Sequence, residues 1–156
     1  MDDKFIMYYD MYYDDVYRLV YSYTFNRSDT EDICQRCFLK LYNLLINTTY
    51  PENYIKQWLF RVAINESKNI LKSFWRKNVF DIDDYDFKLS SKSVSFDIRC
   101  IVEKMPVKYR YVIYLYYYEG YSINEIAYIS KKKEATIKTQ LKRARDLIRK
   151  DVNGYE

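Results

Sequence analysis

The chain contains no histidine among its 156 residues and has only two glycines and two prolines. The absence of histidine excludes His-based catalytic triads and removes the most frequent proton shuttle and metal ligand. No glycine-rich phosphate-binding loop is present either. The scarcity of turn residues favours an all-helical protein over a strand-rich one. We therefore expect an all-α protein that is not an enzyme and that needs no cofactor and no small-molecule substrate.

Cysteine is scarce as well, with three residues in the chain. Cys34 and Cys37 form a CxxC pattern inside a segment of helical periodicity, and Cys100 is the third thiol. Without histidine this set does not complete a common zinc site. We expect Cys34 and Cys37 to be small buried side chains rather than metal ligands or a redox pair. The fold should therefore form without metal and without disulfides.

Long apolar runs are also missing. The first ten residues, MDDKFIMYYD, are acidic and interrupted by charge, and no apolar run approaches the roughly 18 residues that a membrane span needs. Apolar residues nevertheless make up 49% of the chain, which is ample for helical cores. We expect no membrane insertion and a soluble protein in the reducing cytoplasm.

The first half of the chain has the periodicity of three helices. Apolar and aromatic side chains recur at helical spacing, and a group of capping residues that begins at Asn26 interrupts the pattern. Pro51 closes a polar loop and can open the third helix. The predicted helices span about 4–25, 29–46 and 51–77. Together they form the first predicted domain, residues 1–78.

The second half begins with a change of composition. Residues 79–95 are rich in Asp and Ser without sustained periodicity, which predicts an acidic flexible linker. Pro106 and Gly120 then punctuate a second helical unit. Its first two helices are predicted at about 96–105 and 107–119. A helix-turn-helix pair follows, so residues 96–152 form a four-helix second domain.

The segment over residues 121–150 has the pattern of a short helix, a tight turn and a long basic helix. Ser122 and Glu125 form a capping-box pattern at the start of the short helix. Residues 101–151 carry twelve Lys or Arg and six Asp or Glu, a local net charge of +6, whereas the whole chain is only +4. A basic amphipathic helix is often only a solvated face. Positive charge concentrated on a helix-turn-helix pair, however, favours DNA binding.

A second basic element lies in the third predicted helix. Residues 53–78 contain six Lys or Arg against one acidic residue, Glu66. Aromatic residues are interleaved with these cations, as they are in proteins that stack unpaired bases. We expect burial for Trp58, because it shares helical spacing with core positions. Tyr50 and Tyr54, beside the polar loop, are better candidates for base contacts.

Four segments occur in a characteristic order: DTEDICQRCFLKLY (29–42), YIKQWLFRVAINESKNILKSFWRK (54–77), VEKMPVKYRYVIYLYYYEGYSINEIAYI (102–129) and ATIKTQLKRAR (135–145). In this order, with the linker between the second and third, they resemble the sigma-70 family of bacterial RNA polymerase initiation factors, in its small two-domain extracytoplasmic-function group. The resemblance implies a protein that binds bacterial core RNA polymerase and reads the -10 and -35 elements of promoter DNA. It also implies an anti-sigma factor as an inhibitory partner.

The resemblance assigns roles to single positions. The polymerase-binding candidates are Asp32, Gln35 and Arg36, with Arg36 standing where the family usually has Glu. The -10 candidates are Thr49, Tyr50, Asn53, Tyr54, Asn65, Lys68, Asn69 and Lys72. The -35 candidates are Lys131, Lys132, Lys133, Lys138, Thr139, Lys142 and Arg143.

One segment departs from the family pattern. The turn of the helix-turn-helix normally reads Leu-Gly-Ile-Ser, and here residues 130–133 read Ser-Lys-Lys-Lys. Lysine replaces both the glycine that eases a positive φ and the serine that caps the next helix. We expect stronger backbone contacts and weaker sequence selectivity on DNA than in related factors.

Two other classes of protein stay open. A plain helix-turn-helix regulator would act without core polymerase, but it would need a dimer to reach adjacent half-sites. A degenerate sigma-like factor would bind polymerase without recognising promoters, and the altered turn is the feature that favours it.

Overall fold

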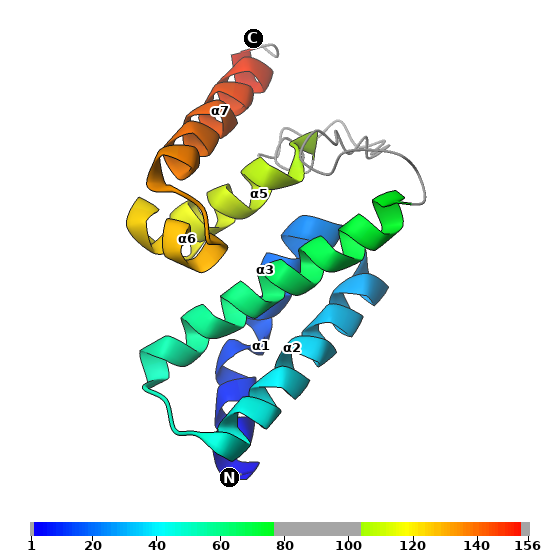
Figure 1. Cartoon of the computed structure of the whole chain (residues 1–156). Coiled ribbons are helices and arrows are strands. Elements are labelled where there is room, and N and C mark those ends of the chain that lie inside the picture. Colours follow the sequence, from blue (N-terminus) through cyan, green and yellow to red (C-terminus); the bar gives the residue numbers. More distant parts are fainter. Residues whose placement is uncertain (1, 77–103, 154–156) are drawn as a thin grey trace. The chain divides into compact units, whose positions relative to one another are not determined.

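The computed structural model describes residues 2–76 and 104–153, and all regular structure within these ranges is helical (Figure 1). The all-α prediction is confirmed. The chain divides into two compact units, Met1–Phe74 and Trp75–Glu156. The predicted linker lies outside the described residues, as does all but the end of the helix predicted over 96–105. The predicted domain bounds therefore stay predictions.

Three helices form the first unit: α1 (Asp2–Thr24), α2 (Arg27–Asn47) and α3 (Glu52–Arg76). Each begins and ends within a few residues of its predicted bounds. The apolar faces of the three helices supply the buried core residues Val16, Leu19, Val20, Tyr23, Ile33, Cys34, Cys37, Phe38, Leu41, Ile55, Leu59, Phe60, Ala63 and Ile64. Full burial of one large apolar side chain contributes about 1.5–3 kcal/mol. This core decides which faces of α2 and α3 point outward.

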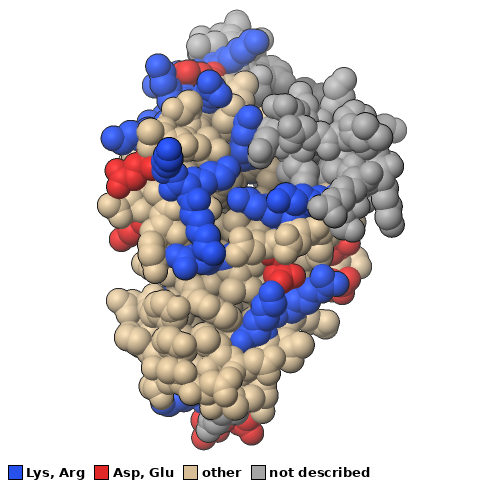
Figure 2. All heavy atoms as spheres, viewed as in Figure 1, with Lys and Arg blue, Asp and Glu red and all other residues tan. Residues whose placement is uncertain are grey.

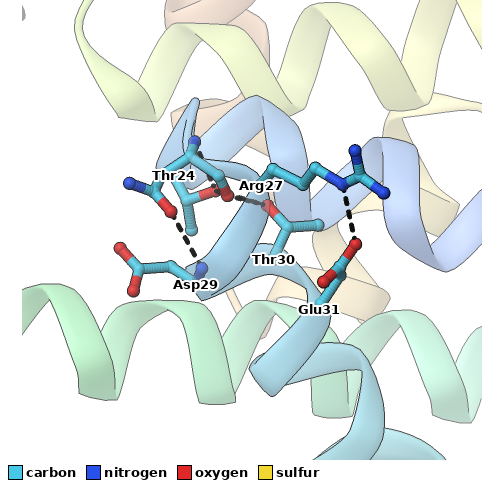
Figure 3. A network of polar contacts seen from close by, with 6 residues as sticks. Thr24, Arg27, Asp29, Thr30 and Glu31 are labelled. Carbon is cyan, nitrogen blue, oxygen red and sulfur yellow. Dashed lines mark hydrogen bonds and ion pairs between the residues drawn. The ribbon is translucent and has the colours of Figure 1, made fainter.

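A polar network closes the corner between α1 and α2 (Figure 3). Asn26 caps α2, because its side-chain oxygen accepts a hydrogen bond from the Asp29 backbone N–H at 2.9 Å. The buried hydroxyls of Thr24 and Thr30 lie 2.6 Å apart, and the Thr30 hydroxyl also donates to the Asn26 carbonyl at 2.7 Å. These bonds satisfy polar groups at the helix end and fix where α2 begins.

The tyrosines of α1 form a ladder along the helix. Aromatic residues recur at every fourth position, so each ring lies beside the ring one turn away. The ladder consists of Phe5, Tyr9, Tyr13, Tyr17, Tyr21 and Phe25, and successive ring centroids are 5.0–6.2 Å apart. Tyr9 and Tyr13 also contact Phe38 of α2, with centroid distances of 4.8 and 5.7 Å. The rings therefore extend the rim of the α1–α2 core, as tyrosine's apolar body and polar tip allow.

The second unit contains α5 (Val107–Ile113), a π-helical turn η2 (Tyr114–Tyr118), α6 (Ile123–Ser130) and α7 (Glu134–Asn153). The single helix predicted over 107–119 therefore changes its hydrogen bonding near its middle. The Glu119 N–H donates to the Tyr114 carbonyl at 3.1 Å, which is the π-type spacing of five residues. Helix α7 packs against both α5 and α6. Among the described residues of this unit, the buried apolar ones are Met105, Val107, Tyr109, Tyr111, Val112, Leu115, Ile126, Ala127, Ile129, Ile137, Leu141 and Ala144.

Both ends of α6 have defined caps. At its start, the Ser122 hydroxyl accepts from the Glu125 N–H at 3.2 Å, and the Glu125 carboxylate accepts from the Ser122 N–H at 2.9 Å. The predicted capping box is therefore confirmed. At its end, Lys131 adopts the left-handed conformation, with φ 55° and ψ 41°. The Lys132 N–H donates to the Ala127 carbonyl at 3.0 Å, which gives the helix a Schellman-type ending.

Candidate functional site

The outward face of α2 carries the three residues predicted to bind polymerase. Asp32, Gln35 and Arg36 are all exposed, and their spacing of three and four residues places them on one side of the helix. One turn further along, Leu39 is 62% exposed and adds an apolar group to this face. Sequence reasoning missed Leu39, although an apolar residue outside the core periodicity was an available signal. The structure thus brings these four side chains onto one surface.

Arg36 has a partner on the neighbouring helix. Glu66 of α3 is only 8% exposed, and its carboxylate accepts a hydrogen bond from Lys40 of α2. Arg36 Nη1 lies 3.9 Å from the other carboxylate oxygen of Glu66. A largely buried carboxylate is costly without compensating cations. The basic residue at position 36, where the family usually has Glu, is therefore matched by an acidic residue on α3.

The connection between α2 and α3, together with the first turn of α3, carries the first group of -10 candidates. Thr49 and Asn53 are exposed, whereas Tyr50 and Tyr54 are partly buried. The rings of Tyr50 and Tyr54 stack on each other, with centroids 4.9 Å apart and planes inclined by 18°. The two rings form a ready aromatic platform.

The second group of -10 candidates lies along α3. Asn65, Lys68, Asn69 and Lys72 are spaced by three and four residues, so they share one side of the helix. Asn65, Asn69 and Lys72 are exposed, and Lys68 is partly buried. Trp58, predicted to be buried, is only partly so. The structure thus gathers the four polar candidates on one face, and it leaves part of Trp58 accessible as well.

Four -35 candidates lie on the outward side of α7. Lys138, Thr139, Lys142 and Arg143 are all exposed, and they lie one helical turn apart in two pairs. The Thr139 hydroxyl donates to the Ala135 carbonyl at 2.9 Å. On the face shown in Figure 2, Lys and Arg side chains gather over α7 and the elements beside it. This side of α7 therefore presents hydrogen-bond donors and positive charge to solvent.

The three lysines of the turn differ from one another. Lys131 and Lys133 are exposed, but Lys132 is partly buried. The Lys132 Nζ lies 5.9 Å from the centroid of the Tyr111 ring, within range of a cation–π contact. Lys133 directly precedes α7, and its carbonyl accepts from the Ile137 N–H at 3.2 Å. A lysine at this position has no side-chain acceptor with which to cap the helix.

Arg145 ties α7 to the π-helical turn. Its Nε donates to the Tyr117 hydroxyl at 2.6 Å, and its guanidinium lies 5.5 and 5.7 Å from the ring centroids of Tyr116 and Tyr117. The hydrogen bond with Tyr117 raises the pKa of Arg145 above its usual value. Arg145 is thus engaged within the second unit, two residues after Arg143.

The described cysteines have the environment expected of core residues. Cys34 and Cys37 are free and fully buried. Burial raises the pKa of the Cys34 thiol to about 12 and also raises the pKa of Cys37. Within residues 2–76 and 104–153, no group of three His, Cys, Asp or Glu side chains is placed to hold a metal ion. None of the helices that the structure describes combines the length and apolar character needed to cross a membrane.

Both halves of the chain match models of known protein families. Residues 8–77 match the family model for sigma-70 region 2, and residues 95–148 match that for sigma-70 region 4. RNA polymerase sigma factor SigV of Bacillus subtilis is 29% identical over 134 residues, which cover 84% of this chain and 80% of SigV. The sigma-E factor of Escherichia coli K12, of the extracytoplasmic-function type, is 27% identical over 138 residues, covering 77% of this chain and 72% of that protein.

A solved structure has the same fold. The sigma factor RpoE of Bartonella quintana, crystallised with the anti-sigma factor NepR, superposes with a TM-score of 0.74 at 20% identity and covers 96% of this chain and 97% of RpoE. With both region models placed in order, the chain belongs to the sigma-70 family. It is a sigma factor of the extracytoplasmic-function type, the class that directs core RNA polymerase to promoters. The resemblance predicted from the four sequence blocks is confirmed.

Proposed function

We propose that this sigma factor attaches to core RNA polymerase through the outward face of α2 and reads the promoter with α3 and α7. The observation that carries the proposal is the placement of the candidates. Asp32, Gln35 and Arg36 share one exposed side of α2, and Lys138, Thr139, Lys142 and Arg143 share one exposed side of α7, while the opposite side of each of these helices is packed in a core. The α2 face offers Asp32, Gln35, Arg36 and Leu39 to polymerase. Sigma factors act by binding polymerase and positioning it on promoter DNA, so no covalent chemistry is assigned to this chain. It works in the cytoplasm with the polymerase.

The -10 element is read at the α2–α3 connection. An unstacked base exposes both its hydrogen-bonding edge and its face, so it can be bound by amide and aromatic groups together. Asn53 offers the amide, and the Tyr50–Tyr54 pair offers the ring faces. Stacking of one base on an aromatic side chain is worth about 1–3 kcal/mol. Lys68 and Lys72 then accompany the phosphates that flank the melted bases.

The -35 element is read by α7 in the major groove. Lys138 and Lys142 lie on the same side of the helix and supply donors for base edges and phosphates. The alternative of a degenerate factor was based on the altered turn. That turn closes α6 with Schellman-type bonds and leads into α7. This ordered turn supports the presentation of α7 to DNA.

The test is a pair of substitutions, Lys138→Ala and Lys142→Ala, in the full chain. The proposal predicts loss of promoter-specific transcription with core binding unchanged. These lysines belong to α7, whereas the proposed polymerase-binding face belongs to α2. The matched control is Lys150→Ala, which removes one exposed lysine from the end of the same helix. Normal promoter use by the double variant would refute the -35 assignment.

An anti-sigma factor is the expected regulator. The structural relative RpoE was solved with the anti-sigma factor NepR, which supports such a partner for a chain of the same fold. A partner that covers the α2 face would compete with polymerase for Asp32, Gln35 and Leu39. Binding assays with purified candidate inhibitors and core polymerase would then show mutually exclusive complexes. Ternary complexes that remain active would contradict the proposal.

A further inference from the structure

Two cations of α2 share one carboxylate of α3. Glu66 is only 8% exposed, and each of its carboxylate oxygens faces a different α2 side chain. Lys40 Nζ donates a hydrogen bond to Glu66 Oε1, whereas Arg36 Nη1 lies 3.9 Å from Glu66 Oε2. These three side chains together have a net positive charge. One positive charge therefore remains beyond what the carboxylate neutralises.

The two cations do not hold the carboxylate equally. A charge-assisted N–H···O bond spans about 2.7–2.9 Å, so Arg36 Nη1, at 3.9 Å, is attracted by charge without a direct hydrogen bond to Glu66 Oε2. Lys40 makes the direct bond. The guanidinium of arginine has several N–H donors in a planar fork, and the Arg36 side chain is 59% exposed. Lys40 therefore satisfies Glu66, while Arg36 keeps donors that a partner can reach.

The side chains around Arg36 indicate which kind of group it can bind. Asp32, one turn earlier, and the exposed Leu39 lie on the same side of α2. A nucleic-acid phosphate beside Arg36 would also meet the Asp32 carboxylate and be repelled by its like charge. A protein surface can place a cation against Asp32, an apolar group against Leu39 and a carboxylate against Arg36. Guanidinium and carboxylate groups pair through two parallel hydrogen bonds, so a protein carboxylate is the favoured partner.

We propose that Arg36 binds a carboxylate of core polymerase and that Lys40 is the positioning residue that keeps Arg36 available, an assignment that rests on the proposed function. Lys40 occupies the largely buried carboxylate of Glu66, so Glu66 does not take up the guanidinium. Without Lys40, Glu66 draws Arg36 toward α3, because a buried carboxylate that lacks a bonded cation is costly. The effect of Lys40 on polymerase binding therefore passes through Glu66 and Arg36.

The proposal predicts a specific order of affinities for core polymerase. Arg36→Gln removes the interfacial charge and should weaken binding by about tenfold, with a larger loss at low salt. Lys40→Gln should weaken binding by about threefold to tenfold, because Glu66 then captures the guanidinium. Lys40→Gln combined with Glu66→Gln should restore the affinity, since no buried carboxylate is left to capture Arg36. Lys40→Arg should retain wild-type affinity, because it keeps a donor and a charge for Glu66.

A purely structural role of Lys40 would give a different pattern. In the Arg36→Gln background, Lys40→Gln should have no further effect on core affinity, because Lys40 acts only through Arg36. An equal effect of Lys40→Gln in both backgrounds would overturn the positioning role. The same conclusion would follow if Lys40→Gln with Glu66→Gln bound no better than Lys40→Gln alone. Urea denaturation of each variant defines conditions in which all of them are folded.

The experiment titrates labelled core polymerase with the full chain and its variants at two salt concentrations. Arg27→Gln is the matched control for Arg36→Gln, since Arg27 is an exposed α2 arginine that also pairs with a carboxylate, that of Glu31, at 2.9 Å. Arg27 lies about 13 Å from Arg36 along the helix axis, beyond the Debye length of about 8–10 Å. Its loss should change core affinity by less than about twofold. Equal losses for Arg27→Gln and Arg36→Gln would indicate a general charge effect and overturn the assignment of Arg36.

Leu39→Asp separates a failure of this inference from a failure of the proposed function, because Leu39 belongs to the same face of α2 but carries no charge. If Leu39→Asp weakens core binding and Arg36→Gln does not, the face binds polymerase and the carboxylate contact is wrong. If neither variant weakens core binding, the proposed function of the α2 face itself fails. Affinity for a promoter duplex is measured in parallel. Loss of DNA affinity in Arg36→Gln with unchanged core affinity would assign Arg36 to a DNA phosphate and overturn the inference.

Discussion

Replacement of Lys131 by glycine should stabilise the second unit against unfolding. The residue has φ 55° and ψ 41° at the end of α6, where the family usually has glycine. The left-handed conformation costs an L-residue about 1–2 kcal/mol. Glycine avoids that cost but loses more backbone entropy on folding, about 0.5–1 kcal/mol. Taken at the middle of both ranges, the difference predicts that Lys131→Gly stabilises the second unit by about 0.5–1 kcal/mol.

Thermal unfolding of the full chain, followed by far-UV circular dichroism, measures the effect. For a unit of this size, 1 kcal/mol shifts the melting temperature by about 4–8 °C, so the transition of the second unit should rise by about 2–8 °C. Hydrogen exchange of the α6 amides would locate the gain, because local opening of the turn should become rarer. The core contacts of α6 are unchanged by the substitution.

The control is Lys138→Gly, which makes the same chemical change at an exposed position inside α7. Glycine there should destabilise by about 0.5–1 kcal/mol, because a helix interior favours lysine. The two variants should therefore move in opposite directions. If Lys131→Gly were neutral or destabilising like Lys138→Gly, the left-handed lysine would not be a source of strain.

Three further predictions concern single interactions. Lys133→Ser should supply the missing cap of α7 and stabilise by about 0.5–2 kcal/mol in urea denaturation, whereas Lys133→Ala should give no such gain. Arg36→Glu should destabilise the first unit more than Arg36→Ala, because it places a second carboxylate near Glu66; the difference should stay below about 1 kcal/mol, since Arg36 is largely exposed, and equal values would contradict the pairing. In a Cys100→Ser background, Cys34 and Cys37 should resist thiol reagents at pH 8 until the chain unfolds. Because burial raises the pKa of Cys34 from 9.0 to about 12, its contribution to stability should be intact below pH 9 and lost as the pH approaches 12; rapid labelling of the native chain or a flat alkaline profile would refute this.

Several features were predictable because local chemistry decides them. The Ser122–Glu125 box follows from two side chains three residues apart, and the structure contains both of its bonds. The missing glycine marked the turn as unusual without fixing its geometry, and the structure shows that Lys131 itself adopts the left-handed conformation that a Schellman ending needs. Helix bounds in the first unit follow from apolar periodicity and the cap at Asn26.

Other features depend on contacts between elements that are distant in sequence. The π-helical turn, whose residue Tyr117 contacts Arg145 28 positions away, has no signal in the periodicity of its own residues. The compensation of Arg36 by Glu66 likewise requires the register between α2 and α3. Leu39 is a different case, since its exposure could have been inferred from the helical pattern of α2.

The most direct test of the central claim is run-off transcription with purified bacterial core polymerase, with and without this chain, on a pool of genomic fragments. A sigma factor with the three proposed surfaces should produce discrete new start sites, and these should disappear with Lys138→Ala and Lys142→Ala while core binding persists. Core binding without any new transcript would instead indicate a factor that does not recognise promoters. DNA binding without core binding would indicate a plain helix-turn-helix regulator, and either result would contradict the assignment.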